Sequence, residues 1–185
     1  MFHLIVSFLF IVFFKDVCLS LSWNPSKIAL NSNVSYELVW QDEFENIGPI
    51  EAIINGETAY APNPKNWAHV IGSNIYGGIQ NYTDSIQNAY IQNGQLTIVA
   101  MKESCTSAML RSKHLQEFIF GIFSAKISLP YGQGMWPSWR LIGNGDPYNL
   151  TWATVGEIDI VEMIGGNTRT NLTDQYAHAT VHWNN

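Results

Sequence analysis

One run of the chain, residues 156–163, has the composition of a buried β-strand but also contains three carboxylates. β-Branched and apolar residues surround Glu157, Asp159 and Glu162, a pattern that predicts a strand buried on at least one face. An unpaired carboxylate in such a position is costly, so acids are seldom placed there for packing. The run therefore predicts a functional site built on a β-strand.

The spacing of the three acids predicts an irregularity in that strand. Side chains alternate between the two faces of a regular strand, so Glu157 and Asp159 share a face while Glu162 would point away. One β-bulge between Asp159 and Glu162 would bring all three onto the same face. Two glutamates with an aspartate between them suit cleavage of a glycosidic bond with retention, in which nucleophile and general acid lie about 5–5.5 Å apart.

The remainder of the chain also has a β pattern, because short alternating runs are separated by Gly, Pro, Asn and Asp. The Asn93-Gly94 pair predicts a hairpin turn. No long stretch keeps a helical period, and there is no internal repeat and no second domain. We expect a long surface loop over 46–66 and strands over 36–40, 89–91, 95–101, 123–129, 135–142 and 176–183. The fold class predicted is all-β, an antiparallel sandwich of two sheets.

The first twenty residues have the pattern of a secretory signal peptide. Residues 4–14 are apolar except for one serine, and small residues follow near Ser20 and Ser22. The run is shorter than the ~20 residues that span a bilayer, and it fits the apolar core of a signal peptide. A retained anchor is the alternative, because no Lys or Arg precedes the run. We expect a secreted protein with residues 21–185 as its single domain and no membrane association after cleavage.

Signal cleavage would leave Cys105 as the only cysteine, which excludes an internal disulfide and predicts a buried, small apolar side chain. Four Asn-x-Ser/Thr sequons are compatible with export, namely Asn33, Asn81, Asn149 and Asn171. The net charge of −6 argues against a nucleic-acid partner, since no basic stripe is present. Seven tryptophans among many Asn, Gln and Ser residues suit a carbohydrate ligand or an aromatic-rich β core. No metal site and no cofactor are expected.

Several short segments, in this order along the chain, resemble one known family. Residues 157–162 resemble the E-[IL]-D-x-x-E signature of glycoside hydrolase family 16, in its laminarinase-like branch. Trp152 lies five residues before Glu157, as in the W-x-x-x-G-E form of that signature. The other similar segments are the opening strand at 37–44, the N-A-x-x-x-x-G-x-L-x-I hairpin at 88–98, the G-x-G-x-W-P-[AS] segment at 132–138 and the His-aromatic pair at 182–183.

This resemblance implies a jelly roll of the concanavalin A-like type, with the acidic strand along the floor of a concave cleft. It implies Glu157 as the nucleophile and Glu162 as the acid/base, with Asp159 holding negative charge between them and orienting the nucleophile. The implied substrate is a β-1,3- or mixed β-1,3/1,4-glucan, and a monomer is expected. Because sandwiches of this kind run to roughly 200–250 residues, we expect C-terminal strands to be missing.

The resemblance also implies substrate-binding residues beside the acids. Trp136 and Trp152 are the candidates for stacking on sugar rings. Trp139 falls on the opposite face of its strand and is expected in the core. His182 is expected to hydrogen-bond an acid or a sugar, with a satisfied core histidine as the alternative. Arg140 stands where the family usually has a second tryptophan, at a polar position on the cleft side.

Two interpretations other than a secreted β-glucanase are possible. One is a non-catalytic β-glucan-recognition protein on the same fold; relatives of that class characteristically lose the catalytic glutamates, whereas all three carboxylates are present here. The other is an incomplete product that does not fold, because an open sandwich leaves an unpaired sheet edge. The retained acids favour the enzyme.

Overall fold

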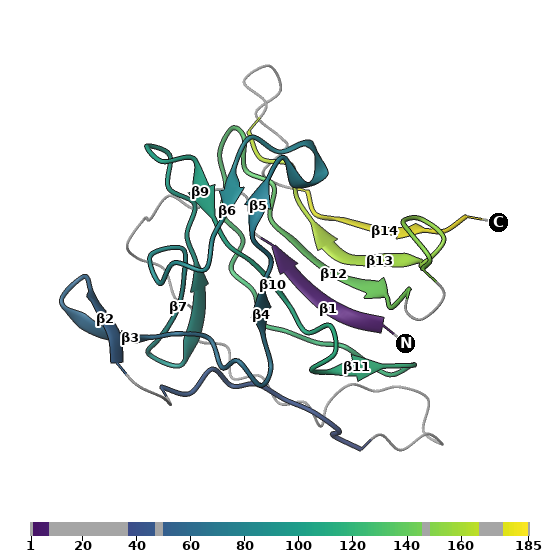
Figure 1. Cartoon of the computed structure of the whole chain (residues 1–185), viewed down its shortest axis with the longest axis horizontal. Helices are drawn as coiled ribbons and strands as arrows, with labels where there is room; N and C mark the ends of the chain where they lie inside the picture. Colours follow the sequence, from purple (N-terminus) through teal and green to yellow (C-terminus); the bar gives the residue numbers. More distant parts are fainter. Residues whose placement is uncertain (1, 8–36, 47–49, 146–148, 167–175, 185) are drawn as a thin grey trace.

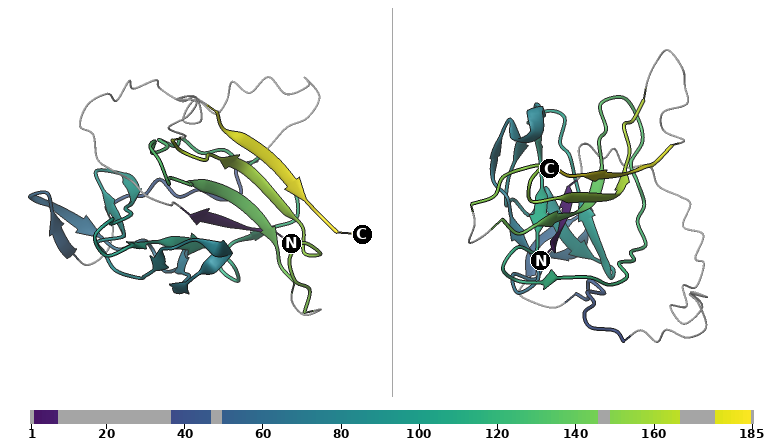
Figure 2. Two further views of the ribbon diagram at one scale, coloured as in Figure 1. Left: turned by 90° about the horizontal axis from the view of Figure 1, so that it is seen from above. Right: turned by 90° about the vertical axis from the view of Figure 1, so that its right-hand side faces the viewer.

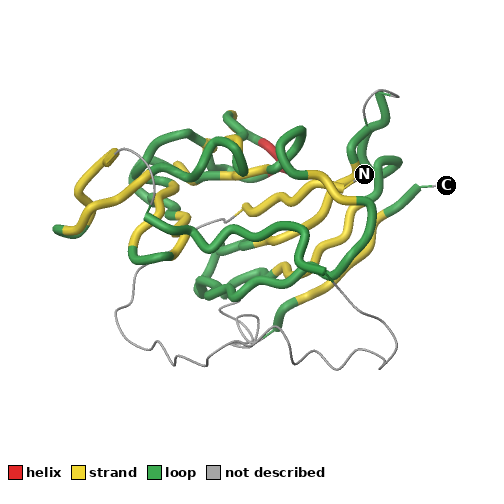
Figure 3. Tube along the Cα trace, turned by 90° about the horizontal axis from the view of Figure 1, so that it is seen from below, coloured by secondary structure: helices red, strands yellow, loops and turns green. Residues whose placement is uncertain are grey.

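The computed structural model describes residues 2–7, 37–46, 50–145, 149–166 and 176–184, which form short strands joined by loops. One 3₁₀ turn, η2 (Ile75–Gly77), is the only helical element of the described part (Figure 3). No helix within these ranges has both the length and the apolar character needed to cross a membrane. The strands are β1 (Phe2–Ser7), β2 (Ile50–Ile54), β3 (Glu57–Tyr60), β4 (Ala68–His69), β5 (Gly72–Ser73), β6 (Asn81–Tyr82), β7 (Ala89–Gln92), β8 (Gln95–Ile98), β9 (Thr106–Ser107), β10 (Met109–Arg111), β11 (Glu117–Phe118), β12 (Ser138–Gly143), β13 (Glu157–Glu162) and β14 (His178–His182).

The strands form one large sheet and two smaller ones (Figure 1). The large sheet has the order β14-β13-β12-β1-β10-β4, with β11 paired to β1, and its strands are antiparallel. The smaller sheets are β2-β3-β7-β8 and β5-β6-β9, the latter with one parallel pair between β6 and β9. Seen from above, the sheets lie as layers (Figure 2). The predicted all-β sandwich is confirmed.

The core lies between the layers and explains the alternation of β12. Trp139 and Leu141 are buried in a cluster with side chains from β7, β8 and β10, as expected for the apolar face of the strand. The apolar residues of β13, including Ile158 and Val161, pack against the same cluster. Because side chains alternate, Arg140 and the acids are left on the opposite face of the large sheet. The core thereby decides which face presents the polar residues.

Two hairpins use the same turn chemistry. The predicted hairpin is confirmed as β7 and β8, joined by Asn93 and Gly94, both with positive φ. A two-residue turn with positive φ at both positions matches the right-handed twist of the strands. The region 46–66, expected to be a loop, instead contains β2 and β3 around Asn55-Gly56, which adopt the same conformation. The loop prediction was wrong, although the same Asn-Gly signal was present in the sequence.

The large sheet differs from the prediction at β1. This strand, from the segment predicted to be a signal peptide, pairs with β10 on one side and β12 on the other. The strand predicted over 123–129 does not form; Phe123 instead packs edge-on against Phe118 of β11, with ring centroids 5.4 Å apart. Each strand edge pairs with one neighbour, and β1 occupies the edge of β12 to which the segment 123–129 would otherwise pair. Residues 8–36, which contain most of the predicted signal peptide, lie outside the described residues.

Two smaller expectations were also wrong. Residues 37–40 form no strand, and Trp40 packs edge-on against Trp67 with centroids 6.0 Å apart. Cys105 is exposed rather than buried, because it lies in a turn with φ of 50°. The sequons at Asn33 and Asn171 fall outside the described residues, whereas Asn81 and Asn149 are both exposed.

Candidate active site

The predicted β-bulge in the acidic strand is confirmed. Opposite β14, Asp159 pairs with Thr180 and Glu162 with His178, so three steps along β13 match two steps along β14. The pairing with β12 also shifts, between Trp139 and Arg140. The extra residue lies within β13, between Asp159 and Glu162, where the spacing of the acids required it.

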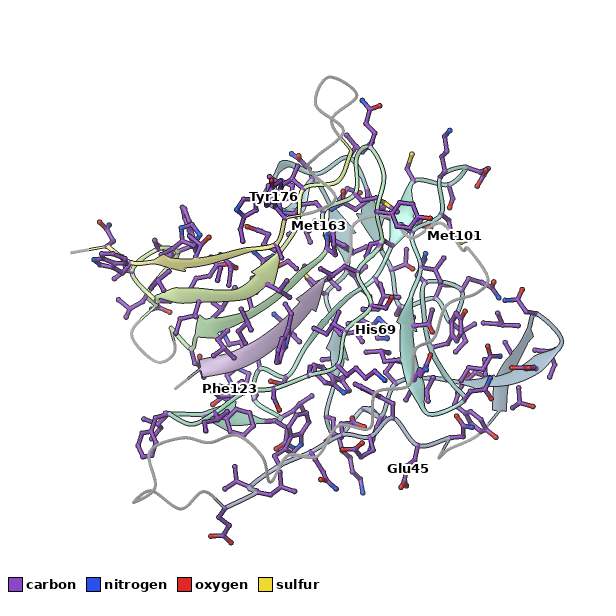
Figure 4. All side chains as sticks on the ribbon, turned by 180° about the vertical axis from the view of Figure 1, so that it is seen from behind. Glu45, His69, Met101, Phe123, Met163 and Tyr176 are labelled. Atoms are coloured by element: carbon purple, nitrogen blue, oxygen red, sulfur yellow. The ribbon has the colours of Figure 1, made fainter. Side chains whose placement is uncertain are left out.

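The bulge places all three acids on one face of the sheet. Along β14 their partners are His182, Thr180 and His178, which are two residues apart and therefore share a face. Residues directly opposite in a ladder project to the same side. Glu157, Asp159 and Glu162 therefore project together from the face opposite the core. Figure 4 labels Met163 and Tyr176 at the end of this pair of strands, where β13 finishes and β14 starts.

Glu157 is buried and held at both oxygens. It is 3% exposed. Arg140 of β12 donates from Nη1 to Oε1 at 2.9 Å, and Trp152 donates from Nε1 to Oε2 at 2.5 Å. Arg140 comes from the neighbouring strand, whereas Trp152 comes from the loop that precedes β13. Two donors from different elements therefore fix the orientation of this carboxylate.

Asp159 is equally buried but less well satisfied. It is 2% exposed; its Oδ2 lies 3.1 Å from Nε2 of His182, and its Oδ1 has no hydrogen-bond partner among the described residues. Burial, followed by the nearby charges of Glu157 and Glu162, raises the pKa of Asp159 from 3.8 to about 6, against the opposing effect of Arg140 and His182. Asp159 therefore titrates close to neutral pH.

This pKa predicts how replacement of Asp159 changes stability with pH. The folded-state pKa of about 6 lies above the ordinary 3.8, so the folded protein binds this proton more tightly than the unfolded chain. The resulting contribution to stability is fully present below pH 3.8 and is lost as the pH rises through 6. Asp159→Asn has no titratable group at this position. Its free energy of unfolding should therefore rise relative to that of the wild type as the pH increases from 4 to 7.

Urea denaturation of both proteins at pH 4, 5, 6 and 7 measures this difference in the free energy of unfolding. Glu103→Gln, at an exposed glutamate, is the control and should follow the wild-type curve. Parallel curves for Asp159→Asn and the wild type would contradict the assignment.

Glu162 is more accessible than the other two acids. It is partly exposed, with the buried Ser138 opposite it on β12 and the exposed His178 opposite it on β14. These two neighbours were not among the predicted site residues. His178 shares the alternation that identified His182, so the sequence contained that signal. An accessible acid beside two buried ones can exchange protons with solvent and with a bound ligand.

The predicted aromatic residues differ in position. Trp152 contacts the site, with its indole 5.8 Å from the His182 ring and its N–H on Glu157, and it remains 61% exposed. Trp136 precedes β12 and is 43% exposed. Arg140, predicted to bind substrate, lies against Glu157 and is 9% exposed. The structure thus brings Arg140, Trp152 and His182 together around Glu157 and Asp159.

Comparison with known proteins relates this geometry to other chains. The profile of Glycosyl hydrolases family 16 matches residues 79–185. A β-glucanase of Rhodothermus marinus is 32% identical over 156 residues, which cover 80% of this chain and 48% of that protein. A β-1,3-glucan-binding protein of Penaeus monodon is 36% identical over 78 residues, which cover 42% of this chain and 21% of that protein.

A solved structure shows the same likeness. The laminarinase of Rhodothermus marinus superimposes with a TM-score of 0.62 at 30% identity, covering 80% of this chain and 56% of that one. The chain spans less than half the length of the two curated relatives. The profile covers β12, β13 and β14 and the three acids Glu157, Asp159 and Glu162. With this match, the chain belongs to glycosyl hydrolase family 16.

Proposed function

We propose that the protein is a retaining glycoside hydrolase that cleaves β-1,3- or mixed β-1,3/1,4-glucans. The observation that carries this proposal is the arrangement of the acids on one face of β13. Glu157 is buried and is held by Arg140 and Trp152, whereas Glu162 is accessible to solvent. Two carboxyl groups in such different environments suit the separate roles of nucleophile and acid/base.

The proposed reaction has two steps. A Glu157 oxygen bonds to the anomeric carbon while the glycosidic bond breaks; the electron pair goes to the leaving oxygen, which takes the proton of Glu162. Water then bonds to the anomeric carbon and gives a proton to the Glu162 carboxylate. The bond to Glu157 breaks in this second step and its electron pair returns to the carboxylate, so both groups are regenerated.

Two observations support a β-glucan as the substrate. The bulged E-x-D-x-x-E spacing resembles the laminarinase-like branch, and the relatives named above are a β-glucanase, a β-1,3-glucan-binding protein and a laminarinase. The exposed indole of Trp152, whose N–H donates directly to Glu157, offers an apolar surface for a sugar ring.

We further propose that the protein is a secreted monomer and that residues 1–20 are removed. Removal would free the edge of β12 that β1 occupies. The segment 123–129 alternates in sequence and lies one turn before β12, so it is suited to pair there. Amino-terminal sequencing of the exported protein tests the cleavage.

The function is tested with a panel of glucans. We expect release of reducing ends from laminarin and lichenan and none from xyloglucan. Proton NMR of the first products should show the β-anomer, because two successive inversions retain the configuration. Release of the α-anomer first would contradict the double displacement.

The glucan-binding relative of Penaeus monodon supports one alternative, a protein that binds β-1,3-glucan without cleaving it. Pull-down on insoluble β-1,3-glucan separates the two functions. Binding without release of reducing ends by the wild type would favour recognition over catalysis.

A further inference from the structure

The most unusual group in the site is the buried guanidinium of Arg140. Its Nη1 lies 2.9 Å from Oε1 of Glu157, and the two side chains are 11% and 4% exposed. In the ladder between β12 and β13, Arg140 stands opposite Asp159. Removing either partner of such a buried ion pair strongly destabilises the protein, because the other charge is left uncompensated. The two residues therefore act as a unit.

The charges around Glu157 come from every neighbouring element. They are Arg140 from β12, Asp159 and Glu162 from β13 itself, and His182, directly opposite Glu157 on β14. The uncharged donor is Trp152. Among these groups, Arg140 has the only permanent positive charge, because a histidine is charged only when protonated. The charge on Glu157 is therefore balanced by Arg140.

We propose that Arg140 is a positioning residue that acts through Glu157 and stabilises the charge that returns to it when the glycosyl-enzyme is hydrolysed. This inference rests on the proposed function. In the covalent intermediate Glu157 is a neutral ester, so its ion pair with the Arg140 guanidinium is broken. When water attacks the anomeric carbon, the bond to Glu157 breaks and its electron pair restores the carboxylate. The restored ion pair favours this second step.

The burial of Arg140 favours this positioning role over the predicted binding of substrate. Its Nη1 donates to Glu157 and its side chain is almost fully buried, so little of the guanidinium is left for contact with a sugar. A carboxylate oxygen has two lone pairs, so the oxygen that accepts from Arg140 keeps one for the anomeric carbon. Arg140 and Trp152 together fix the plane of the carboxylate without blocking it.

The test is Arg140→Met, which removes the charge but keeps most of the length. Loss of a charge-assisted hydrogen bond should lower kcat about 10- to 100-fold. KM should fall with kcat, because slow hydrolysis makes the covalent intermediate accumulate. Rapid acid quench and intact-mass measurement during turnover of laminarin should show the glycosyl adduct in the variant. Arg140→Lys, which keeps a point charge, should recover most of kcat.

Controls make the outcomes distinct. Arg111→Met makes the same change at an exposed arginine of β10 and should behave as the wild type. If Arg140→Met does not fold by circular dichroism, Arg140→Gln replaces it in the comparison with Arg140→Lys. If the wild type is active and the neutral variants have a raised KM with unchanged kcat, the inference is overturned and Arg140 is assigned to substrate binding. If the wild type is active and those variants have the same kcat and KM as the wild type, the inference is also overturned. A wild type that releases no reducing ends would instead reject the proposed function.

Discussion

Glu157→Gln is expected to lower glucan hydrolysis by about 10⁴-fold or more, on the scale seen when other enzymes lose a covalent nucleophile. An amide does not attack the anomeric carbon, so no glycosyl-enzyme forms. The loss should appear in kcat/KM as well as kcat, because the first chemical step is removed. Reducing-end release from laminarin, measured beside the wild type, gives the ratio.

The same substitution is also expected to lower the stability of the protein. Both oxygens of Glu157 accept hydrogen bonds, and an amide offers one acceptor and two donors, so Arg140 and Trp152 cannot both be satisfied. The variant should therefore be less stable, and its fold must be checked by circular dichroism at the assay temperature. Glu103→Gln, at an exposed glutamate, is the matched control. Substantial hydrolysis by a folded Glu157→Gln protein would exclude Glu157 as the nucleophile.

Glu162→Ala is expected to lower glucan hydrolysis about 10²- to 10⁴-fold, the usual contribution of general acid–base catalysis. The effect should depend on the leaving group. A dinitrophenyl β-glucoside has a leaving group that needs no proton, so formation of the glycosyl-enzyme should be nearly unaffected and its hydrolysis should become limiting. Azide requires no general base and should restore turnover, giving the β-azide. Glucan and aryl glucoside kinetics, with and without azide, measure the role.

The azide products of variants at Glu157 and Glu162 distinguish the roles of the two acids. Azide added to a Glu157→Ala protein should give the α-azide, since it attacks in place of the missing nucleophile. Equal losses on glucan and activated glucoside in Glu162→Ala, with no effect of azide, would show that Glu162 is not the acid/base. The products thus assign each acid independently of the size of the rate loss.

Much of the site follows from the order of residues in β13. The five-residue interval from Glu157 to Glu162 predicts a bulge, and the ladders on both sides of the strand contain it. This inference succeeds because side-chain alternation is a property of the strand itself. The Asn93-Gly94 hairpin was predictable for a similar local reason, the positive φ that its turn requires.

Other features depended on contacts between distant segments. Alternation alone placed a strand over 123–129, but a strand also needs an unpaired edge, and β1 takes the edge of β12. The position of Arg140 on the polar face was predictable, whereas its partner was not. The register between β12 and β13 brings its guanidinium within reach of Glu157. The donor on the other oxygen, Trp152, comes from a loop whose path no periodic pattern describes.

The sequence by itself thus determined the β class, the face shared by the three acids and the bulge that unites them, because these depend on local periodicity and turn chemistry. Tertiary structure alone decided which groups balance the charge of Glu157, how deeply Asp159 is buried, and which segment pairs with β12. Each of these features depends on which segments, distant in sequence, come into contact, and this is determined by packing and by the strand edges that are available for pairing.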